Sequence, residues 1–305
     1  MWKFILFKVS LHTLGRLPLP LLYGLISVLA DLVYVFSPKP RRNVWDNLRH
    51  VMPAGTPKGQ MRATARQVFR NVALYYADLL HMSRMDMDDF FHHRFVFHGF
   101  HEHLLPSVRA GKGVIILGAH YGNPELAAQG LIPLGVRVLA LTEPLKPASL
   151  SRFVDRLRSG PGHIFLPVSI GSVKRVMQTL ESGGVVALMA DRDIRGPKAL
   201  LPFCGRETLM PTGPIEVALR TGATVIPAFN IRRRNYTIEA YLEEPLELQR
   251  TGDMEADIRA GALRFLERLE RHLHADPGQW AVLEAIWEPL TEPVLEPAPA
   301  VRGKP

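Results

Sequence analysis

GVIILGAHYGNPELA, residues 113–127, joins an apolar run to a polar turn and the start of a predicted helix. Residues 113–119 are continuously apolar and partly β-branched, as in a strand that is buried on both faces of a parallel sheet. His120 follows this run directly, and Asn123 with Pro124 forms a favourable N-cap and first helical residue. The stretch therefore predicts a strand, a tight turn and a helix, with a histidine at the carboxyl end of the strand.

The alternation of strands and helices continues towards the C-terminal part of the chain. Four further β-branched runs are separated by segments with helical periodicity and capping residues. Ser172 is expected to cap one of these helices, and Gly213 with Pro214 to open another. We predict an α/β fold with a mixed, mostly parallel central sheet flanked by helices. The expected strands are 136–142, 163–169, 185–191 and 224–230, followed by an edge strand at 237–248 and a helix over 255–274.

The first hundred residues lack this alternation and are predicted to be helical. Residues 17–36 are almost entirely apolar, and Pro18 and Pro20 keep a helix from starting much before Pro20. The remaining stretch of about 17 residues would be roughly 26 Å long, slightly short of a hydrocarbon core of about 30 Å. We expect residues 1–40 to anchor the chain to a membrane, at the interface or as one short span. A core helix and a cleaved signal peptide are the alternatives.

The rest of the chain is predicted to form one domain and a tail. A basic amphipathic helix is expected within residues 37–53, and a longer helix over residues 59–88. Residues 41–290 then make up the α/β domain. Residues 291–305 contain four prolines and are expected to be a disordered tail.

The charge distribution favours a lipid partner. The formal net charge is +8, and residues 1–50 contain seven Lys or Arg against two Asp. Basic residues beside leucine-rich sequence favour an anionic membrane surface over nucleic acid, because a nucleic-acid groove interleaves basic side chains with polar and aromatic ones. The single cysteine, Cys204, excludes an intramolecular disulfide and suits a reducing compartment. We expect a protein at the cytoplasmic face of the cytoplasmic membrane that binds no nucleic acid.

His120 is the principal candidate catalytic residue, because ligand clefts of α/β sheets form at the carboxyl ends of strands. Gly122 would let the first turn of the next helix, which contains Glu125, fold back towards the strand end. We expect the Glu125 carboxylate to accept the imidazole Nδ1–H and to leave Nε2 free as a base. The alternative is that His120 only caps the strand and Glu125 only favours the helix dipole.

No protein nucleophile accompanies this pair in the sequence. There is no G-x-S-x-G elbow, and the cysteine is not near a histidine. The pair is therefore predicted to activate a hydroxyl of the substrate. We do not expect a metal site at the histidines within residues 92–103, because a second element with suitable ligand spacing is missing. We do not expect one at Asp191 and Asp193 either, because side chains at i and i+2 of a strand end point apart.

The spacing His120-x4-Glu125 resembles the H-x4-[DE] active-site motif of the glycerolipid acyltransferase superfamily. The resemblance is greatest to the lipid A lauroyl/myristoyl acyltransferase family, which includes the phosphatidylinositol mannoside acyltransferases. Similar blocks follow in order from Arg41 to Pro289: RRNVWDNL, AGKGVIILGAHYGNPELA, LMADRD, PFCGR, MPTGPIEVALRTGATVIPAF and PGQWAVLEAIWEP.

This resemblance implies a glycerol-3-phosphate acyltransferase-like fold and an O-acyltransferase. The acyl group would pass from an acyl thioester, acyl-ACP or acyl-CoA, to a hydroxyl of a glycolipid. It implies no covalent acyl-enzyme, no metal and no other cofactor.

The resemblance also implies further site residues. Glu143 and Arg158 stand where the mannoside branch has an acidic residue and an arginine of the site. The lipid A branch has an arginine in place of Glu143, which favours a phospholipid-linked or other sugar over lipid A as the acceptor. Asp191 stands at an acidic position of the family, although without the family it reads as a strand-terminating turn. Arg206 is expected near the next helix N-terminus, where it could bind a phosphate or lie solvated at the surface.

Two other classes of function remain open. A lipid hydrolase or thioesterase would use the same histidine on water, and a non-catalytic lipid-binding protein would have a decayed site. The intact set of His120, Glu125, Arg158 and Asp191 favours an enzyme.

Overall fold

Seven strands form one sheet in the order β1-β9-β8-β2-β5-β3-β4 in the computed structural model, which describes residues 2–159, 162–192 and 196–287. Neighbouring strands are parallel except for β8 and β9, which are antiparallel. The predicted mixed, mostly parallel sheet is therefore confirmed. The strands are β1 (Phe95–His98), β2 (Val114–Gly118), β3 (Val138–Thr142), β4 (Ile164–Pro167), β5 (Val185–Met189), β8 (Thr224–Arg232) and β9 (Ile238–Leu242).

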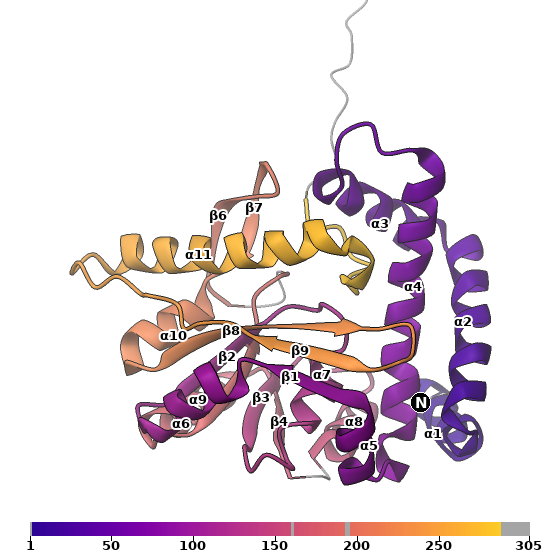
Figure 1. The fold of residues 1–305 in the computed structure, drawn as a ribbon, viewed down its shortest axis with the longest axis horizontal. Coiled ribbons are helices and arrows are strands. Elements are labelled where there is room, and N and C mark those ends of the chain that lie inside the picture. The colour runs from indigo at the N-terminus through magenta and orange to yellow at the C-terminus, as the bar shows by residue number, and fades with distance from the viewer. Residues whose placement is uncertain (1, 160–161, 193–195, 288–305) are drawn as a thin grey trace, which may run out of the picture.

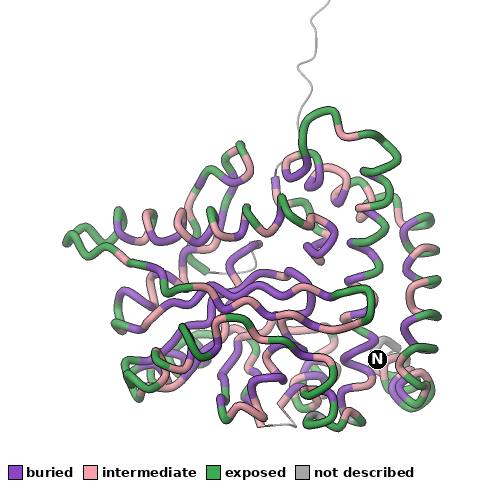
Figure 2. Tube along the Cα trace, in the orientation of Figure 1, coloured by how far each residue is buried: buried purple, intermediate pink, exposed green. Residues whose placement is uncertain are grey.

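Helices cover both faces of the sheet. Ile115 and Leu117 of β2 contact the helices of one face, whereas Val114 and Ile116 contact those of the other. Because β2 is buried on both sides, its sequence is a continuous apolar run, and Figure 2 shows the strands as mostly buried. The face towards Ile115 carries α9 (Ile170–Glu181), α10 (Gly213–Thr221) and α11 (Met254–Ala275). The opposite face carries the π-helical turn Phe100–Leu104, α6 (Leu105–Arg109), α7 (Pro124–Gln129) and α8 (Ala148–Ser159).

Helix α4 (Lys58–His81) joins the apolar N-terminal helix to the α/β part of the chain. Figure 1 shows α4 beside one end of the sheet, with α2 (Leu19–Phe36) along its outer side. Leu22 and Tyr23 of α2 pack in a buried cluster with Leu74 and Ala77 of α4. The remaining helices of this part are α1 (Trp2–Thr13), α3 (Pro38–Val51) and α5 (Met87–Arg94).

A buried polar cluster fixes this helical part to the loop after β2. Asp78 of α4 accepts hydrogen bonds from the Tyr23 hydroxyl at 2.5 Å and the Asn123 amide at 2.6 Å, and it forms an ion pair with Arg232. The Asp78 and Arg232 side chains are 1% and 4% exposed, so the loss of either partner would leave a buried charge, at a cost of about 3–5 kcal/mol. The same Asn123 caps α7 by accepting from the Leu126 N–H. The α2–α4 pair thus supports the turn that carries the candidate site.

Two predicted boundaries in the helices are wrong. The helix expected over residues 59–88 ends at His81, because Asp86 caps the separate helix α5 with its carboxylate. The N-cap of α9 is Ser169, and Ser172 instead occupies the third helical position, where it closes a capping box.

Two features of the strands also differ from the expectation. The strand predicted at the sheet edge, β9, is an inner strand, because the aromatic-rich β1 pairs with its outer side. A two-stranded antiparallel hairpin, β6 (Lys198–Phe203) and β7 (Arg206–Pro211), was not predicted. The tail expected over residues 291–305 lies outside the described residues.

Candidate active site

His120 is held by a buried aspartate. Its ring Nδ1 lies 2.8 Å from Asp191 Oδ1, and its backbone N–H donates to Asp191 Oδ2 at 2.9 Å. The Trp280 indole N–H also donates to Asp191 Oδ2, at 2.9 Å. Asp191 is fully buried, whereas the His120 side chain is 28% exposed. Burial opposes ionisation of Asp191, but the charge of His120 and the hydrogen bonds from His120 and Trp280 outweigh burial and lower the Asp191 pKa.

The expected contact between Glu125 and His120 Nδ1 is therefore wrong, and the register of the sheet explains why. Gly118 of β2 lies opposite Met189 of the adjacent parallel strand β5. His120 and Asp191 each lie two residues beyond these partners, so the parallel pairing brings them together at the same sheet edge. Asp191 thus makes the contact with His120 Nδ1 that was expected of Glu125.

The turn after His120 has room only for glycine. Gly122 has φ +67°, and a Cβ there would lie 2.0 Å from the Asn230 carbonyl oxygen. The Gly122 N–H donates to the Gln279 carbonyl at 2.8 Å, and the Ala281 N–H donates to the His120 carbonyl at 2.7 Å. The segment around Trp280 therefore holds both the imidazole's partner and the backbone of the histidine itself.

Glu125 pairs with an arginine and a tyrosine instead. It lies in the first turn of α7, as predicted, and its Oε2 is 2.9 Å from Arg158 Nε and accepts a hydrogen bond from the Tyr75 hydroxyl. Arg158 also donates to the Tyr75 oxygen at 2.7 Å. Burial raises the pKa of Tyr75 well above its usual value, and the neighbouring Glu125 raises it further, so the phenol stays protonated as a donor. The predicted residues Glu125 and Arg158 are brought together in one network.

A large, mainly apolar cavity of about 1200 Å³ connects these groups. This volume exceeds the roughly 300–1,000 Å³ of common small-molecule sites, so it suits a long ligand. Its lining includes His120, Glu125, Arg158 and Glu143, and Phe7 of α1 contributes to its wall. Much of the remaining wall is aliphatic or aromatic, and includes Leu141, Leu145, Leu150, Val154, Phe165, Val173, Val176 and Met177.

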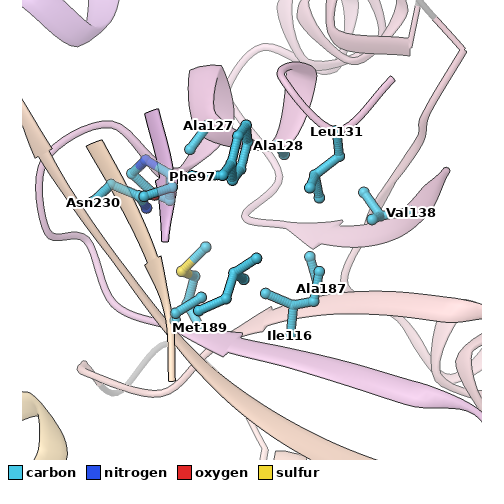
Figure 3. A pocket seen from close by; sticks show the side chains of 14 residues that line it. Phe97, Ile116, Ala127, Ala128, Leu131, Val138, Ala187, Met189 and Asn230 are labelled. Carbon is cyan, nitrogen blue, oxygen red and sulfur yellow. The ribbon is translucent and has the colours of Figure 1, made fainter. Parts of the chain in front are cut away.

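A second cavity lies against the sheet beside α7. Figure 3 shows Phe97, Ile116, Leu131 and Met189 around it. Its volume of about 40 Å³ leaves room for only a few water-sized groups. An alkyl chain fits the larger cavity and not this one.

Of the predicted binding residues Glu143 and Arg206, Glu143 lines the large cavity and Arg206 does not. Glu143 directly follows β3 and accepts a hydrogen bond from Arg192 at 3.0 Å in the large cavity. Arg206 is the first residue of β7 and does not line the cavity. The extended strand separates it from the start of α10 by roughly 20 Å. The expectation that Arg206 lies near this helix N-terminus is wrong.

The histidines of residues 92–103 have local structural contacts. His92 and His93 lie within hydrogen-bonding distance of backbone carbonyls of their own helix, and His98 stacks on Tyr241 at 4.5 Å between ring centroids. In the part of the chain that the structure describes, no group of three or more His, Cys, Asp or Glu side chains could hold a metal ion. Asp193 lies outside the described residues.

Tyr75 and Trp280 were not predicted as site residues. Tyr75 lies on a helix without any local motif, and its role follows from tertiary packing of α4 against α7 and α8. Trp280 belongs to a quoted block, PGQWAVLEAIWEP, but a tryptophan in an irregular segment gives no spacing signal for its partner.

The geometry predicts which carboxylate sets the histidine tautomer. In ¹⁵N NMR spectra of the neutral imidazole, His120 is expected to carry its proton on Nδ1. Asp191→Asn should mix the two tautomers, because the amide can donate as well as accept. Glu125→Gln is the matched control and should leave the His120 signals in the Nδ1–H form. The reverse pattern, with the tautomer lost only in Glu125→Gln, would contradict the structural assignment.

Comparison with known proteins identifies the family of this chain. The model of the bacterial lipid A biosynthesis acyltransferase family matches residues 1–288. The phosphatidylinositol mannoside acyltransferase of Mycobacterium tuberculosis (strain H37Rv) is 31% identical over 191 residues, which are 61% of this chain and 58% of that protein. The phosphatidylinositol mannoside acyltransferase of Mycolicibacterium smegmatis is 28% identical over 190 residues, 61% of this chain and 60% of that protein.

The aligned part thus spans about three fifths of the length of these relatives, whereas the family match extends over nearly the whole chain. The family match is long enough to assign the chain. The protein belongs to the bacterial lipid A biosynthesis acyltransferase family.

Proposed function

We propose that this protein is a membrane-associated O-acyltransferase that moves a fatty acyl group from an acyl thioester to a hydroxyl of a glycolipid. The donor is acyl-ACP or acyl-CoA, and the reaction takes place at the cytoplasmic face of the membrane. His120 is the general base, and Asp191 orients it. Family membership and the names of the relatives support the acyl transfer and the glycolipid acceptor.

One observation carries this proposal: an imidazole held through Nδ1 by a buried carboxylate lies on the wall of a large, mainly apolar cavity. With Nδ1 bonded to Asp191, Nε2 is the nitrogen available to a ligand. An Nδ1–H···carboxylate contact fixes the tautomer with a lone pair on Nε2 and stabilises the imidazolium once a proton is taken. This is the arrangement required of a general base for a hydroxyl group.

The reaction needs no protein nucleophile. His120 Nε2 takes the proton of the acceptor hydroxyl as its oxygen attacks the thioester carbonyl carbon. The tetrahedral intermediate then breaks its C–S bond, and the imidazolium returns the proton to the departing thiolate. The described lining of the cavity contains no cysteine, and its Ser169 hydroxyl takes part in the capping box of α9. Both support direct transfer between the two substrates.

Glu125 has a positioning role in this mechanism. Its side chain is 8% exposed and forms an ion pair with Arg158. Burial alone would lower the pKa of Arg158, but the charge of Glu125 outweighs burial and raises it. The Glu125–Arg158–Tyr75 network connects α7, α8 and α4 along one wall of the cavity. It therefore keeps the first turn after His120 in place.

The apolar N-terminal helix is proposed to lie on the membrane surface. Among the described residues, α2 is the one helix long and apolar enough to cross a membrane, and only four of its eighteen residues are buried. Asp31 of α2 pairs with Arg66 and Arg70 of α4, whose side chains are 44% and 46% exposed. Exposed arginines beside α2 would be costly in a hydrocarbon core but not at the headgroup level. The interfacial alternative for the anchor is therefore favoured over a span.

This placement brings the cavity close to the bilayer. Phe4 and Phe7 of α1 pack edge-on against Phe153 of α8, with ring centroids 5.8 and 6.1 Å apart, and Phe7 also lines the cavity. A lipid acceptor could thus reach His120 while its alkyl chains stay in contact with apolar surface. The carboxylate Glu143, at the position where the lipid A branch has arginine, favours a phospholipid-linked or other sugar as the acceptor head.

The first test of the proposal removes the base. His120→Ala should lower kcat for acyl transfer by about 10²–10⁴-fold, the usual contribution of a positioned general base. Transfer is measured with radiolabelled acyl thioester and membrane glycolipids of the source organism. The matched control is His98→Ala, which removes a half-exposed histidine outside the cavity.

Two outcomes would contradict the proposal. Near-normal transfer by a folded His120→Ala protein would exclude His120 as the base. Release of free fatty acid at the same rate with and without glycolipid would indicate a hydrolase.

The second test concerns the membrane surface. Leu32→Glu, on the outer side of α2 with 49% exposure, should lower the fraction of protein that sediments with anionic vesicles, because it places a charge in the apolar contact. Leu209→Glu on β7, where the leucine is 47% exposed, is the matched control and should sediment like the native protein. Equal sedimentation of the two variants would be evidence against α2 as the contact surface.

A further inference from the structure

Four polar or aromatic side chains lie together in the cavity outside the His120–Asp191 and Glu125–Arg158 pairs. They are Tyr76 of α4, Glu143 after β3, Arg192 after β5 and Glu284 in the irregular segment after Trp280. Tyr76 is 51% exposed, and the side chains of Glu143 and Glu284 are 50% and 63% exposed. Large, exposed groups of this kind inside a cavity are available to a ligand.

Arg192 is the centre of this cluster. Its guanidinium lies 3.0 Å from Glu143 Oε2 and 3.3 Å from Glu284 Oε1, so it connects two carboxylates from distant parts of the chain. Its Nε is buried and has no hydrogen-bond partner among the described residues. The two carboxylates keep further lone pairs free, because each oxygen can accept more than one hydrogen bond.

Tyr76 places an aromatic ring next to these charges. Its ring stands nearly perpendicular to that of Tyr75, at 84° and 5.4 Å between centroids. Tyr75 in turn bonds to Glu125 and Arg158, so Tyr76 is fixed one residue away from the network beside His120. Tyr76, Arg192 and Glu284 line the same cavity, and burial raises the pKa of the Tyr76 phenol.

The charge of the cluster indicates the kind of ligand. One arginine and two glutamates sum to a net charge of −1, so a phosphate would meet repulsion as well as attraction. A neutral polyhydroxyl ligand fits better, because its hydroxyls can donate to the carboxylates and accept from the guanidinium. The C–H bonds on one face of a sugar ring carry slight positive charge and pack on the negative face of an aromatic ring.

We propose that Tyr76, Glu143, Arg192 and Glu284 form a sugar-binding subsite that presents a neutral sugar ring of the acceptor to His120. This inference rests on the proposed function, and it names the part of the acceptor that the protein recognises. It assigns a binding role to Tyr76, Arg192 and Glu284 and gives Glu143 a specific ligand chemistry. The sugar would lie over the Tyr76 ring with its hydroxyls between the three charged side chains.

The test measures sugar binding directly and does not depend on turnover. Saturation-transfer NMR is recorded on the full chain in detergent micelles with methyl α-mannopyranoside and methyl α-glucopyranoside as neutral probes. Inorganic phosphate is used as a competitor. The native protein should transfer saturation to ring protons of at least one glycoside, and phosphate at equal concentration should not displace it.

Single variants locate the site. Tyr76→Ala should weaken glycoside binding about tenfold, the loss expected for one aromatic contact, whereas Tyr76→Phe keeps the ring and should retain most of it. Glu284→Gln should also weaken binding. Glu247→Gln, which alters an ion-paired glutamate that is 94% exposed and outside the cavity, is the matched control and should bind like the native protein.

Three results would overturn the subsite: no saturation of either glycoside by the native protein, equal binding by Tyr76→Ala, or displacement of the sugar by phosphate. In transfer assays, the acceptor KM of Tyr76→Ala should rise more than its kcat falls. A native protein that binds the glycoside but transfers no acyl group would instead contradict the proposed function. The two failures are therefore distinguishable.

Discussion

The contact between the buried Asp191 carboxylate and His120 determines the arrangement of the whole site. One oxygen of this carboxylate faces the imidazole Nδ1, and the other accepts from the His120 backbone and the Trp280 indole. A fully buried charge is tolerated only when its hydrogen-bonding capacity is used, and here three donors from two segments use it. The contact therefore fixes the histidine side chain, its backbone and the segment around Trp280 at the same time.

The N-terminal helices contribute to the site as well as to the proposed membrane contact. Helix α4 supplies Tyr75 to the Glu125–Arg158 network, and Asp78 to the cluster that holds Asn123. Asp78 also binds Tyr23 of the apolar helix α2. A shift of α2 can thus displace the turn after His120, because the Tyr23–Asp78 and Asp78–Asn123 hydrogen bonds connect the two. The proposed anchor and the candidate site therefore belong to one packed structure.

The sequence was sufficient to predict the fold class and the strand that carries His120, because β2 is a continuous apolar run followed by strong turn and capping residues. The correct partner of His120 could not be predicted from local spacing. The spacing of five residues favoured Glu125, whereas the pairing register of β2 with β5 selects Asp191. Arg206 was misplaced for a similar reason, since the hairpin β6–β7 had no recognised turn signal. Tyr75 and Trp280 depend on packing between distant segments, which a single sequence does not encode as a pattern.

The central claim is that a histidine, held by Asp191, removes the proton of a lipid hydroxyl. The most direct measurement is chemical rescue of His120→Gly, in which soluble imidazoles of different basicity are added and the acyl transfer rate is determined at saturating substrates. Imidazole is expected to restore transfer, and the rescued rate should rise with the basicity of the added imidazole because it replaces the His120 base. A folded His120→Gly protein that binds both substrates but gains no transfer activity from any imidazole would contradict it.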